Sequence, residues 1–468
     1  RGLMSQFTWT DRSVRQALGL SADLADPSLE YASVSTDSRS VGEGTLFVAL
    51  VGERFDGHDF VVDALAKGAV GAVVSRPVET NPGAPLYPVE DTLAALGSLA
   101  TFRRSALDVP VVAITGSSGK TTTKDFTRAA LGMTRAVHAT PENLNNRIGM
   151  PLTLLSIPTE VDVVLVEMGS NEPGEISTLS AIARPDIAVV TTVGESHLDR
   201  LGSFAGVLDE KLDLFRSMTE GGRCVVGDEP AALVDAAQAI CSDLRIAGWS
   251  ERADPDLRPD QFERDVFGAP RFKWRGHPVT LALPGRHSVV NALISLAISE
   301  LVGVSARDAV RGLASAEVSS LRGEIRQIGN VRVVADCYNA NPQSLRAALE
   351  VLGDQPGNSR TVAVLGTMLE LGNEAARLHE ETLEYALGLN IDLVVATGGF
   401  AEAAEALEVD EPEVLRSQDW RKAYPALRDW LEGDEVLLLK ASRGIALENM
   451  LPLLDSDFGS KGTGVVLG

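Results

Sequence analysis

The sequence predicts an α/β protein of three domains: a small α/β domain at the N-terminus, a central parallel sheet that carries a phosphate-binding loop, and a Rossmann-like domain at the C-terminus. Its 468 residues exceed the roughly 100–200 residues of a single domain. Over the last two-thirds of the chain, short apolar runs of buried-strand type alternate with helical patterns, which is typical of parallel sheets covered on both faces. One of these runs ends in a glycine-rich turn that leads straight into a helix.

The first block, residues 4–108, is expected to form the N-terminal domain. Its expected elements are strands over residues 45–50 and 69–74 and a helix over residues 92–105. Met4 is the expected native start, and the residues around it lack the basic and then apolar pattern of a signal peptide.

Residues 109–317 are expected to form the central domain. Its buried strands are expected at residues 109–114, 161–166, 187–192 and 223–226. The spacing of apolar residues predicts helices over 203–218 and 287–302. The segment 250–285 is rich in Pro, Arg and Asp, and we expect a hairpin there.

The third block, residues 318–468, again alternates strands with helices and predicts a second doubly wound sheet of Rossmann type. The expected strands lie at residues 331–335, 361–365, 391–397 and 435–439. No GxGxxG sequence stands at the first turn of this block, so nothing indicates a dinucleotide cofactor.

The most informative stretch of the chain is the run VVAITGSSGKTTT, which begins at Val111. Glycines at 116 and 119 let the backbone curl so that N–H groups face phosphate oxygens, and the helix that follows adds positive charge. Lys120 can reach the β- and γ-phosphates, and the hydroxyl of Thr121 can bind Mg²⁺. This short TGxxGKT loop predicts a P-loop ATPase-like central domain. The residues expected to bind the nucleotide here are Gly116, Ser117, Ser118, Gly119, Lys120, Thr121 and Thr122.

Polar side chains follow other strands of the predicted sheets. Because ligands of open α/β sheets bind at the carboxyl ends of the strands, Glu167 could hold Mg²⁺, His197 could bind or orient a ligand, and Asp336 could accept from ribose hydroxyls. Each residue also has an ordinary explanation, as a solvated strand-end acid, a polar loop histidine or a turn residue. From composition alone, Lys211 belongs to a charged, solvent-facing helix.

Composition and charge argue against several classes of protein. The 42 basic and 65 acidic side chains give a net charge of −23, which disfavours a broad surface for nucleic acid or anionic lipid. The three cysteines show no CxxC or Cys/His ligand spacing, which disfavours a disulfide framework and favours a reducing cytoplasm. No apolar run approaches the length that spans a bilayer, so membrane insertion is not expected.

Several motifs together resemble the Mur ligase family, whose members are ATP-dependent amide-forming enzymes of peptidoglycan precursor synthesis. These motifs are the TGSSGKTTT loop, VEMG at 166–169, HLD at 197–199, and GRH at 285–287 with Asn291. Other segments resemble the branch that adds D-alanyl-D-alanine to UDP-N-acetylmuramoyl-tripeptide. They are STDSR at 35–39, ERFDGHD at 53–59, DCYNANP at 336–342 and LGTMLELG at 365–372.

The resemblance runs from residue 34 to residue 451 and implies a reaction. ATP would phosphorylate the terminal carboxylate of the UDP-linked tripeptide, and the amine of D-alanyl-D-alanine would attack the acyl phosphate. The expected product serves cell-wall synthesis, and hence cell shape and division. We expect a monomeric, cytoplasmic enzyme that uses ATP and Mg²⁺.

The same resemblance implies roles for single residues. Lys120 and Thr121 would serve ATP and Mg²⁺, and Glu167 and His197 would help bind the metal. Lys211 matches a helix lysine that is often carbamylated in the family, which would turn a cation into a carboxylate-like metal ligand. The residues expected to act in catalysis are Lys120, Lys211, His197 and Arg322.

The third block is expected to reach the nucleotide. Asn291 matches a residue that contacts adenine, Arg322 matches an arginine that reaches the nucleotide from the third domain, and Asp336 matches the ribose acceptor. The residues expected to contact substrate are Ser38, Arg39, Gly57, His58, Asn143, Asn146, Tyr338, Asn339, Asn341, Lys440, Ser442 and Arg443. The chain departs from the family pattern at Thr367, where an acid is usual, and at Ala441, where glycine is common.

Two alternatives remain open from the sequence. One is a sibling amide ligase that adds the third amino acid or acts on folate or cyanophycin; the missing Asp-Asn-Pro-Arg run and the YNANP segment disfavour these siblings. The other is a non-catalytic nucleotide-binding module, which would need none of Glu167, His197 and Lys211. The sequence does not distinguish lysine from diaminopimelate as the third residue of the tripeptide.

Overall fold

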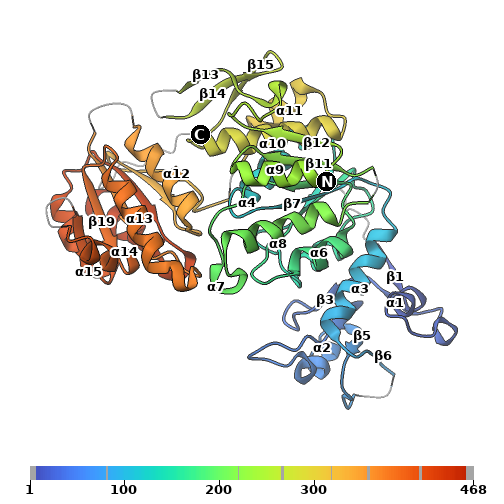
Figure 1. The fold of residues 1–468 in the computed structure, drawn as a ribbon. Coiled ribbons are helices and arrows are strands. Elements are labelled where there is room, and N and C mark those ends of the chain that lie inside the picture. The colour runs from blue at the N-terminus through green and yellow to red at the C-terminus, as the bar shows by residue number, and fades with distance from the viewer. Residues whose placement is uncertain are drawn as a thin grey trace.

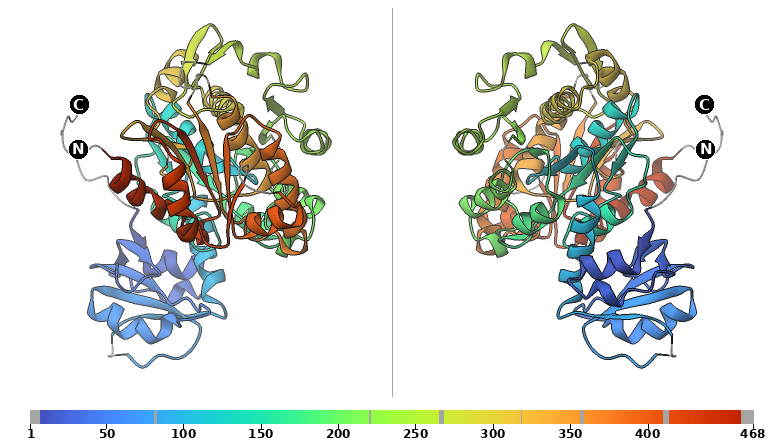
Figure 2. Two further views of the ribbon diagram at one scale, coloured as in Figure 1. Left: turned by 90° about the vertical axis from the view of Figure 1, so that its left-hand side faces the viewer. Right: turned by 90° about the vertical axis from the view of Figure 1, so that its right-hand side faces the viewer.

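The computed structural model of the protein describes residues 7–80, 83–219, 221–264, 268–317, 319–355, 359–409 and 414–459. The chain folds into three α/β domains, as the sequence predicts. The central and C-terminal domains lie next to one another, and the N-terminal domain projects away from both (Figure 1). The views from the two opposite sides, each turned by 90° from Figure 1, show the same projecting N-terminal domain (Figure 2). None of the helices in the described part of the chain combines the length and the apolar character that a bilayer crossing requires.

The N-terminal domain is built on a small parallel sheet with strand order β3-β4-β5-β6, beside an antiparallel pair of β1 and β2. Its elements are β1 (Trp9–Thr10), α1 (Asp11–Ala17), η1 (Ala22–Leu24), β2 (Glu30–Tyr31), β3 (Ser33–Ser35), β4 (Thr45–Val48), η2 (Gly57–Phe60), α2 (Val61–Ala66), β5 (Ala69–Val74), β6 (Leu86–Pro88) and α3 (Thr92–Ser105). The strand predicted over 69–74 and the helix predicted over 92–105 are confirmed, and the strand predicted over 45–50 is two residues shorter.

Helix α3 connects the N-terminal domain with the central one. Asp91 caps the helix by accepting from the backbone N–H groups of Leu93 and Ala94, at 2.7 and 3.1 Å. The last turn carries Arg103 and Arg104, which suit the negative end of the helix dipole. The helix also packs against α5 and α6 of the central domain. The two domains are therefore joined through a packed helix.

The central domain contains a six-stranded, fully parallel sheet with order β12-β11-β10-β7-β9-β8. Its elements are β7 (Val111–Thr115), α4 (Lys120–Gly132), β8 (Val137–Ala139), α5 (Gly149–Leu155), β9 (Val163–Glu167), α6 (Glu175–Ala183), β10 (Ile187–Val190), α7 (Leu198–Leu201), α8 (Phe204–Arg216), β11 (Arg223–Gly227), α9 (Ala231–Ile240), β12 (Leu244–Ala247), η3 (Pro255–Leu257), β13 (Asp260–Arg264), β14 (Pro270–Trp274), β15 (His277–Thr280), α10 (Arg286–Leu301) and α11 (Ala306–Leu313). Strand β7 lies between β9 and β10, where the strand order reverses, and such a switch point is the usual ligand site of an open sheet.

The alternation of side chains along β7 shows why its apolar run is continuous. Val112 and Ile114 face the core that contains α4, α10 and α11. Val111 and Ala113 face the opposite core, which includes α3, α6 and α8. Because both faces of the sheet are covered, every position of the strand is buried and apolar until its carboxyl end.

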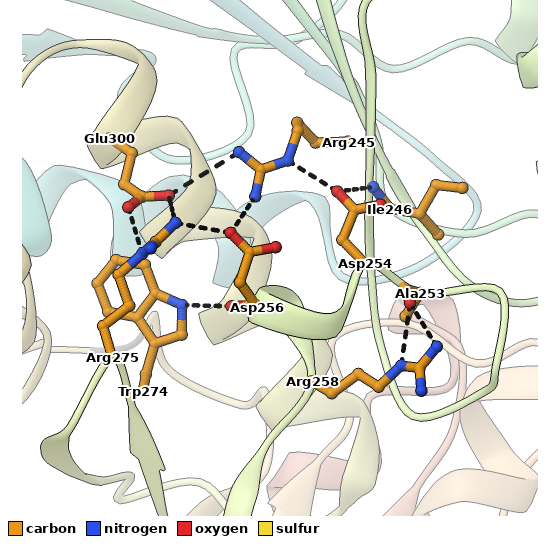
Figure 3. Close-up of polar contacts among 9 residues, drawn as sticks. All are labelled: Arg245, Ile246, Ala253, Asp254, Asp256, Arg258, Trp274, Arg275 and Glu300. Atoms are coloured by element: carbon orange, nitrogen blue, oxygen red, sulfur yellow. Dashed lines mark hydrogen bonds and ion pairs between the residues drawn. The ribbon is translucent and has the colours of Figure 1, made fainter.

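Residues 250–285 form more than the expected hairpin, because β13, β14 and β15 make a three-stranded antiparallel sheet. A network of charged side chains fastens this sheet to β12 and α10 (Figure 3). Asp256 Oδ2 accepts from Arg245 at 2.8 Å and from Arg275 at 2.6 Å. Glu300, on α10, pairs with the same Arg275 at 2.5 Å. The indole N–H of Trp274 also donates to the carbonyl of Asp256 at 3.0 Å.

The C-terminal domain has a second six-stranded sheet, with order β16-β17-β21-β18-β19-β20; the edge strand β16 is antiparallel and the others are parallel. Its elements are β16 (Glu324–Ile328), β17 (Val331–Asp336), α12 (Pro342–Gly353), β18 (Thr361–Leu365), η4 (Gly372–Glu374), α13 (Ala375–Leu387), β19 (Leu393–Thr397), α14 (Gly399–Ala406), β20 (Val414–Ser417), α15 (Trp420–Trp430), β21 (Val436–Lys440), η5 (Arg443–Ile445), η6 (Leu447–Met450) and α16 (Leu451–Phe458). The strand predicted at 361–365 is confirmed, and the other three predicted strands are shifted at their ends by one or two residues.

The network around Asp256 gives a prediction about stability. Asp256→Asn should lower the free energy of unfolding of the central domain by about 1 kcal/mol, which corresponds to a fall in Tm of about 2–4 °C, because one carboxylate serves two arginines. Differential scanning calorimetry measures the shift. Asp429→Asn is the matched control, since Asp429 is exposed and pairs with its neighbour Arg428, and it should change stability by less than about 0.5 kcal/mol. Equal shifts in both variants would contradict a fastening role for the network.

Candidate functional site

The turn between β7 and α4 requires glycine at two positions. Gly116 has φ 145°, and a Cβ atom there would lie 2.1 Å from Thr191 Oγ1. Gly119 has φ 81°, and a Cβ atom there would lie 2.6 Å from Asn291 Oδ1. Both the backbone conformation and the close neighbours therefore exclude a side chain. Helix α4 then begins at Lys120, so its N-terminus points at the turn as the sequence predicts.

Residues that follow β10 hold the turn in place. The backbone N–H of Ser117 donates to Thr192 O at 2.9 Å, and the Ser117 hydroxyl donates to Gly194 O at 3.0 Å. Thr191 Oγ1 donates to Ser118 O at 2.5 Å. Neither threonine was predicted from the sequence to be a site residue. Their position at the carboxyl end of a strand beside β7 was the signal that could have identified them.

Lys120 lies within the curl of the loop. Its Nζ donates to Gly116 O at 2.7 Å. Burial lowers the pKa of Lys120 below its ordinary value; the positive charge of Arg322 acts in the same direction, and the negative charge of Glu167 opposes both. The ammonium group thus lies in a partly buried site, where its charge acts more strongly on an anion than it would in bulk water.

Glu167, at the end of β9, lies beside the start of α4 as expected. Its Oε1 accepts from Thr121 Oγ1 at 3.2 Å and from Asn145 Nδ2 at 2.8 Å. The side chain is buried, and Oε2 has no hydrogen-bond partner among the described residues. Lys124 Nζ lies 3.7 Å from Oε2. A buried carboxylate oxygen next to a threonine hydroxyl fits Mg²⁺, which prefers hard oxygen ligands and takes few of them from the protein.

The other expected metal ligands point to different partners. His197 Nδ1 lies 2.6 Å from Oε2 of Glu370, which belongs to the C-terminal domain. Lys211 is buried, and its Nζ donates to Ser170 Oγ at 2.7 Å. In the described part of the chain, no three His, Cys, Asp or Glu side chains gather as a metal-binding group. The structure thus brings Thr121 and Glu167 together, and the metal roles of His197 and Lys211 stay predictions.

The side chain of Lys211 is buried, whereas composition alone predicts that it lies on a solvent-facing helix. Burial, together with the positive charge of Lys120, lowers the pKa of Lys211 to about 7. Glu210 and Glu175 favour the charged form but do not outweigh these two effects. A large fraction of the amine is therefore neutral near pH 7, and a neutral amine is a nucleophile.

The first residues of the C-terminal domain lie across from the loop. The guanidinium of Arg322 stacks 3.8 Å above the ring centre of Tyr338. Asp336 Oδ2 pairs with Lys440 Nζ at 2.6 Å, and the same Nζ donates to Asn339 O at 3.1 Å. The side chain of Asp336 keeps 23% of its surface exposed, which leaves an oxygen available to a ligand.

A cavity of about 1260 Å³ lies between the central and C-terminal domains, around the glycine-rich turn. A volume of this size holds a nucleotide and part of a second substrate. The expected residues that line it are Ser117, Ser118, Gly119, Lys120, Thr121, Thr122, Asn143, Asn146, Glu167, His197, Asn291, Arg322, Asp336, Tyr338, Asn339, Asn341, Lys440 and Arg443. The expected residues that do not line it are Gly116, Lys211, Ser442, Ser38, Arg39, Gly57 and His58.

The N-terminal candidates for substrate contact are engaged within their own domain. Arg39 pairs with Asp37 at 2.8 Å. His58 is buried, with Nδ1 at 2.5 Å from Asp56 Oδ1 and Nε2 accepting from the N–H of Ser75 at 2.8 Å. Gly57 allows a close backbone approach, because a Cβ atom there would lie 2.7 Å from Leu50 O. The carbonyl of Ser38 accepts from Lys67 Nζ at 3.2 Å. Their contact with substrate stays a prediction.

The two departures from the family pattern have structural roles. Thr367 Oγ1 accepts from the N–H of Gly399 at 3.0 Å, at the start of α14. Ala441 is fully buried, and a Cβ atom at Gly366 would lie 2.7 Å from its own Cβ. Ser442, next in the chain, accepts from the N–H of Leu369 at 3.0 Å. These three residues position the loop that carries Glu370.

The chain matches three domains that known proteins share. The Mur ligase family catalytic domain matches residues 30–104, the Mur ligase middle domain matches residues 114–299, and the Mur ligase glutamate ligase domain matches residues 321–443. Two similar relatives carry the name UDP-N-acetylmuramoyl-tripeptide--D-alanyl-D-alanine ligase. The Bacillus subtilis protein is 34% identical over 92% of this chain and 94% of its own, and the Escherichia coli protein is 34% identical over 94% and 97%.

Solved structures agree with the sequence relatives. MurF from Acinetobacter baumannii superposes with a TM-score of 0.87 at 32% identity and covers 97% of this chain and 100% of its own. The MurF ligase from Thermotoga maritima, solved in complex with ADP, gives a TM-score of 0.80 at 28% identity over 91% and 97%. The similarity therefore extends over all three domains.

The left-handed conformation of Gly119 leads to a prediction about nucleotide binding. Gly119→Ala should weaken the binding of an ATP analogue by about tenfold or more, because the new Cβ strains a left-handed backbone and meets Asn291. Isothermal titration calorimetry measures the change. Gly132→Ala, at the other end of the same helix, is the control, since a Cβ there meets nothing within 4 Å. Unchanged binding in Gly119→Ala would show that the turn does not hold the phosphates.

Proposed function

The chain belongs to the Mur ligase family, and from that premise we propose that it joins D-alanyl-D-alanine to UDP-N-acetylmuramoyl-tripeptide in peptidoglycan precursor synthesis. It is an ATP-dependent ligase, like the relatives over whose length it aligns. The observation that carries the proposal is the shared cavity, in which Lys120 and Glu167 of the central domain face Arg322 and Asp336 of the C-terminal domain.

The terminal carboxylate of the tripeptide is a poor acylating agent, so the reaction requires its activation. The γ-phosphoryl group passes from ATP to an oxygen of the tripeptide carboxylate, and ADP is released. The amine of D-alanyl-D-alanine then attacks the acyl carbon, phosphate leaves with the oxygen it received, and the amine loses a proton. Lys120 and the backbone N–H groups of the loop stabilise the negative charge that accumulates when the tripeptide carboxylate approaches the triphosphate of ATP.

Other residues complete the nucleotide site. Arg322 approaches the phosphates from the C-terminal domain, Asp336 accepts from the ribose hydroxyls, and Asn291 contacts adenine. These groups come from two domains. Closure of one domain on the other would therefore exclude water from the site and protect the acyl phosphate from hydrolysis.

We propose Mg²⁺ as the metal, held by Thr121 and Glu167. When bound, it would neutralise negative charge on the phosphate oxygens. Because Nδ1 of His197 faces Glu370 Oε2 at 2.6 Å, the other ring nitrogen would be the one to help hold the metal or a phosphate oxygen. The close contact with His197 also lowers the pKa of the Glu370 carboxyl and keeps it ionised.

The substrate contacts of the proposal are those expected from the sequence. They are Ser38, Arg39, Gly57, His58, Asn143, Asn146, Tyr338, Asn339, Asn341, Lys440, Ser442 and Arg443. The limits 4–108, 109–317 and 318–468 are likewise proposed for the domains, and each family match lies within one of them. We propose a monomer that acts in the cytoplasm.

Release of phosphate tests the proposed function. With ATP and Mg²⁺, the purified protein should release phosphate only when both UDP-N-acetylmuramoyl-tripeptide and D-alanyl-D-alanine are present, and mass spectrometry should find the UDP-linked pentapeptide. A panel of single amino acids in place of the dipeptide is the control. Equal turnover with a single amino acid would assign the chain to a sibling ligase instead.

Lys211 gives a pH-dependent prediction. Only the neutral amine reacts with CO₂, so a pKa of about 7 should allow carbamylation at pH 8 and suppress it below pH 7. Protein depleted of CO₂ should gain activity on addition of bicarbonate at pH 8, and ¹³C-bicarbonate should give a carbamate signal in NMR spectra. Lys211→Arg should show neither effect. Absence of both effects in the wild type at pH 8 would exclude the modification.

A further inference from the structure

Thr192 connects three separate parts of the molecule. Its backbone carbonyl accepts from the N–H of Ser117 in the phosphate loop, at 2.9 Å. Its hydroxyl donates to Glu229 O, in the segment that follows β11, at 2.9 Å. The same hydroxyl accepts from Gln343 Nε2 of the C-terminal domain at 2.7 Å. A hydroxyl has one proton to donate, so the contact from the C-terminal domain has to come from a donor, which the Gln343 amide supplies.

Gln343 lies in a capped helix start that contacts the central domain. It occupies the first turn of α12, and its side chain contacts Thr192 of the central domain. Asn341 caps the helix by accepting from the N–H of Ser344, and Pro342 fixes the first helical position. The side-chain amide of Asn341 also approaches Ser117 O, at 3.4 Å. The helix start therefore touches the phosphate loop directly and, through Thr192, indirectly.

The central domain leaves room for Gln343. A Cβ atom at Gly194 would lie 2.7 Å from Gln343 Oε1, so a larger residue there would displace the amide. Gly194 also exchanges two hydrogen bonds with the side chain of Ser117, both at 3.0 Å. The amide thus packs against the backbone segment that shapes the loop.

We propose that Gln343 is a positioning residue: its hydrogen bond to Thr192 holds the C-terminal domain closed over the phosphate loop for phosphoryl transfer. This inference rests on the proposed function. Arg322 and Asp336 reach the nucleotide only when the two domains are together, and Gln343 lies on the same side of that cavity. Loss of this bond lowers the closed fraction and leaves the loop of the open form intact.

The test uses the full-length protein and matched substitutions. Gln343→Met and Thr192→Val, each of nearly native shape, should each lower kcat about three- to tenfold, as expected for the loss of the hydrogen bond between the domains. Thr192→Val also removes the hydrogen bond to Glu229 O inside the central domain. The double variant should lose no more than either single variant. The dissociation constant of a non-hydrolysable ATP analogue, measured by calorimetry, should rise by no more than the factor by which the closed fraction falls, because the phosphate loop itself is unchanged. Gln327→Met, at an exposed glutamine with a local contact to Gly329 O, is the control and should keep wild-type kcat.

Thr192→Ser separates positioning from packing. Serine keeps the hydroxyl and loses a methyl group, so the inference expects near-wild-type kcat for Thr192→Ser and a reduced value for Thr192→Val. A packing role would reverse that order, because valine keeps the shape of threonine. Wild-type kcat in Gln343→Met, or multiplied losses in the double variant, would overturn the inference. Should the wild type itself form no pentapeptide, the proposed function would fail instead, so the two failures are distinguishable.

Discussion

The whole site depends on how closely the backbone at Gly116 and Gly119 approaches its neighbours. Both glycines have conformations or contacts that a side chain would not permit, and the neighbours are Thr191 and Asn291. This tight curl places Lys120 at the first position of α4 and directs its ammonium group back over the loop. Strand β7 lies between β9 and β10, so Thr191 after β10 and Glu167 at the end of β9 lie beside the curl, while α10 supplies Asn291.

Local charge, rather than total charge, explains how an acidic protein can bind a triphosphate. The chain carries a net charge of −23, yet the charge of Arg322 lowers the pKa of Lys120, and the charge of Lys120 lowers the pKa of Lys211. Screening limits electrostatic interactions at the surface to about 8 Å at physiological salt, so the acidic surface has little effect on this buried set. Burial and the charge of Lys120 together lower the pKa of Lys211, and the same positive charge would stabilise an anion formed there.

Most of the fold and part of the site could be predicted from the sequence, and the site residues that were not predicted share a cause. The buried strands, the helix over 92–105 and the glycine loop followed from local patterns, because periodicity and glycine chemistry act over a few residues. Glu167 was predicted to lie near the loop since parallel strands end at one edge of a sheet. Asn145, Thr192, Gln343 and Glu370 were missed as functional residues. Each acts through a contact with a segment that is distant in the sequence, and apart from the position of Thr192 after a strand beside β7, no local pattern indicates these contacts.

The central claim is that the turn ending in Lys120 holds the terminal phosphate of a nucleotide while it passes to a carboxylate. The most direct test is the rate of pentapeptide formation by Lys120→Ala, with circular dichroism and thermal unfolding to establish that the variant is folded. The account predicts a folded protein with no pentapeptide above background. Ligation at the wild-type rate by the folded variant would contradict it.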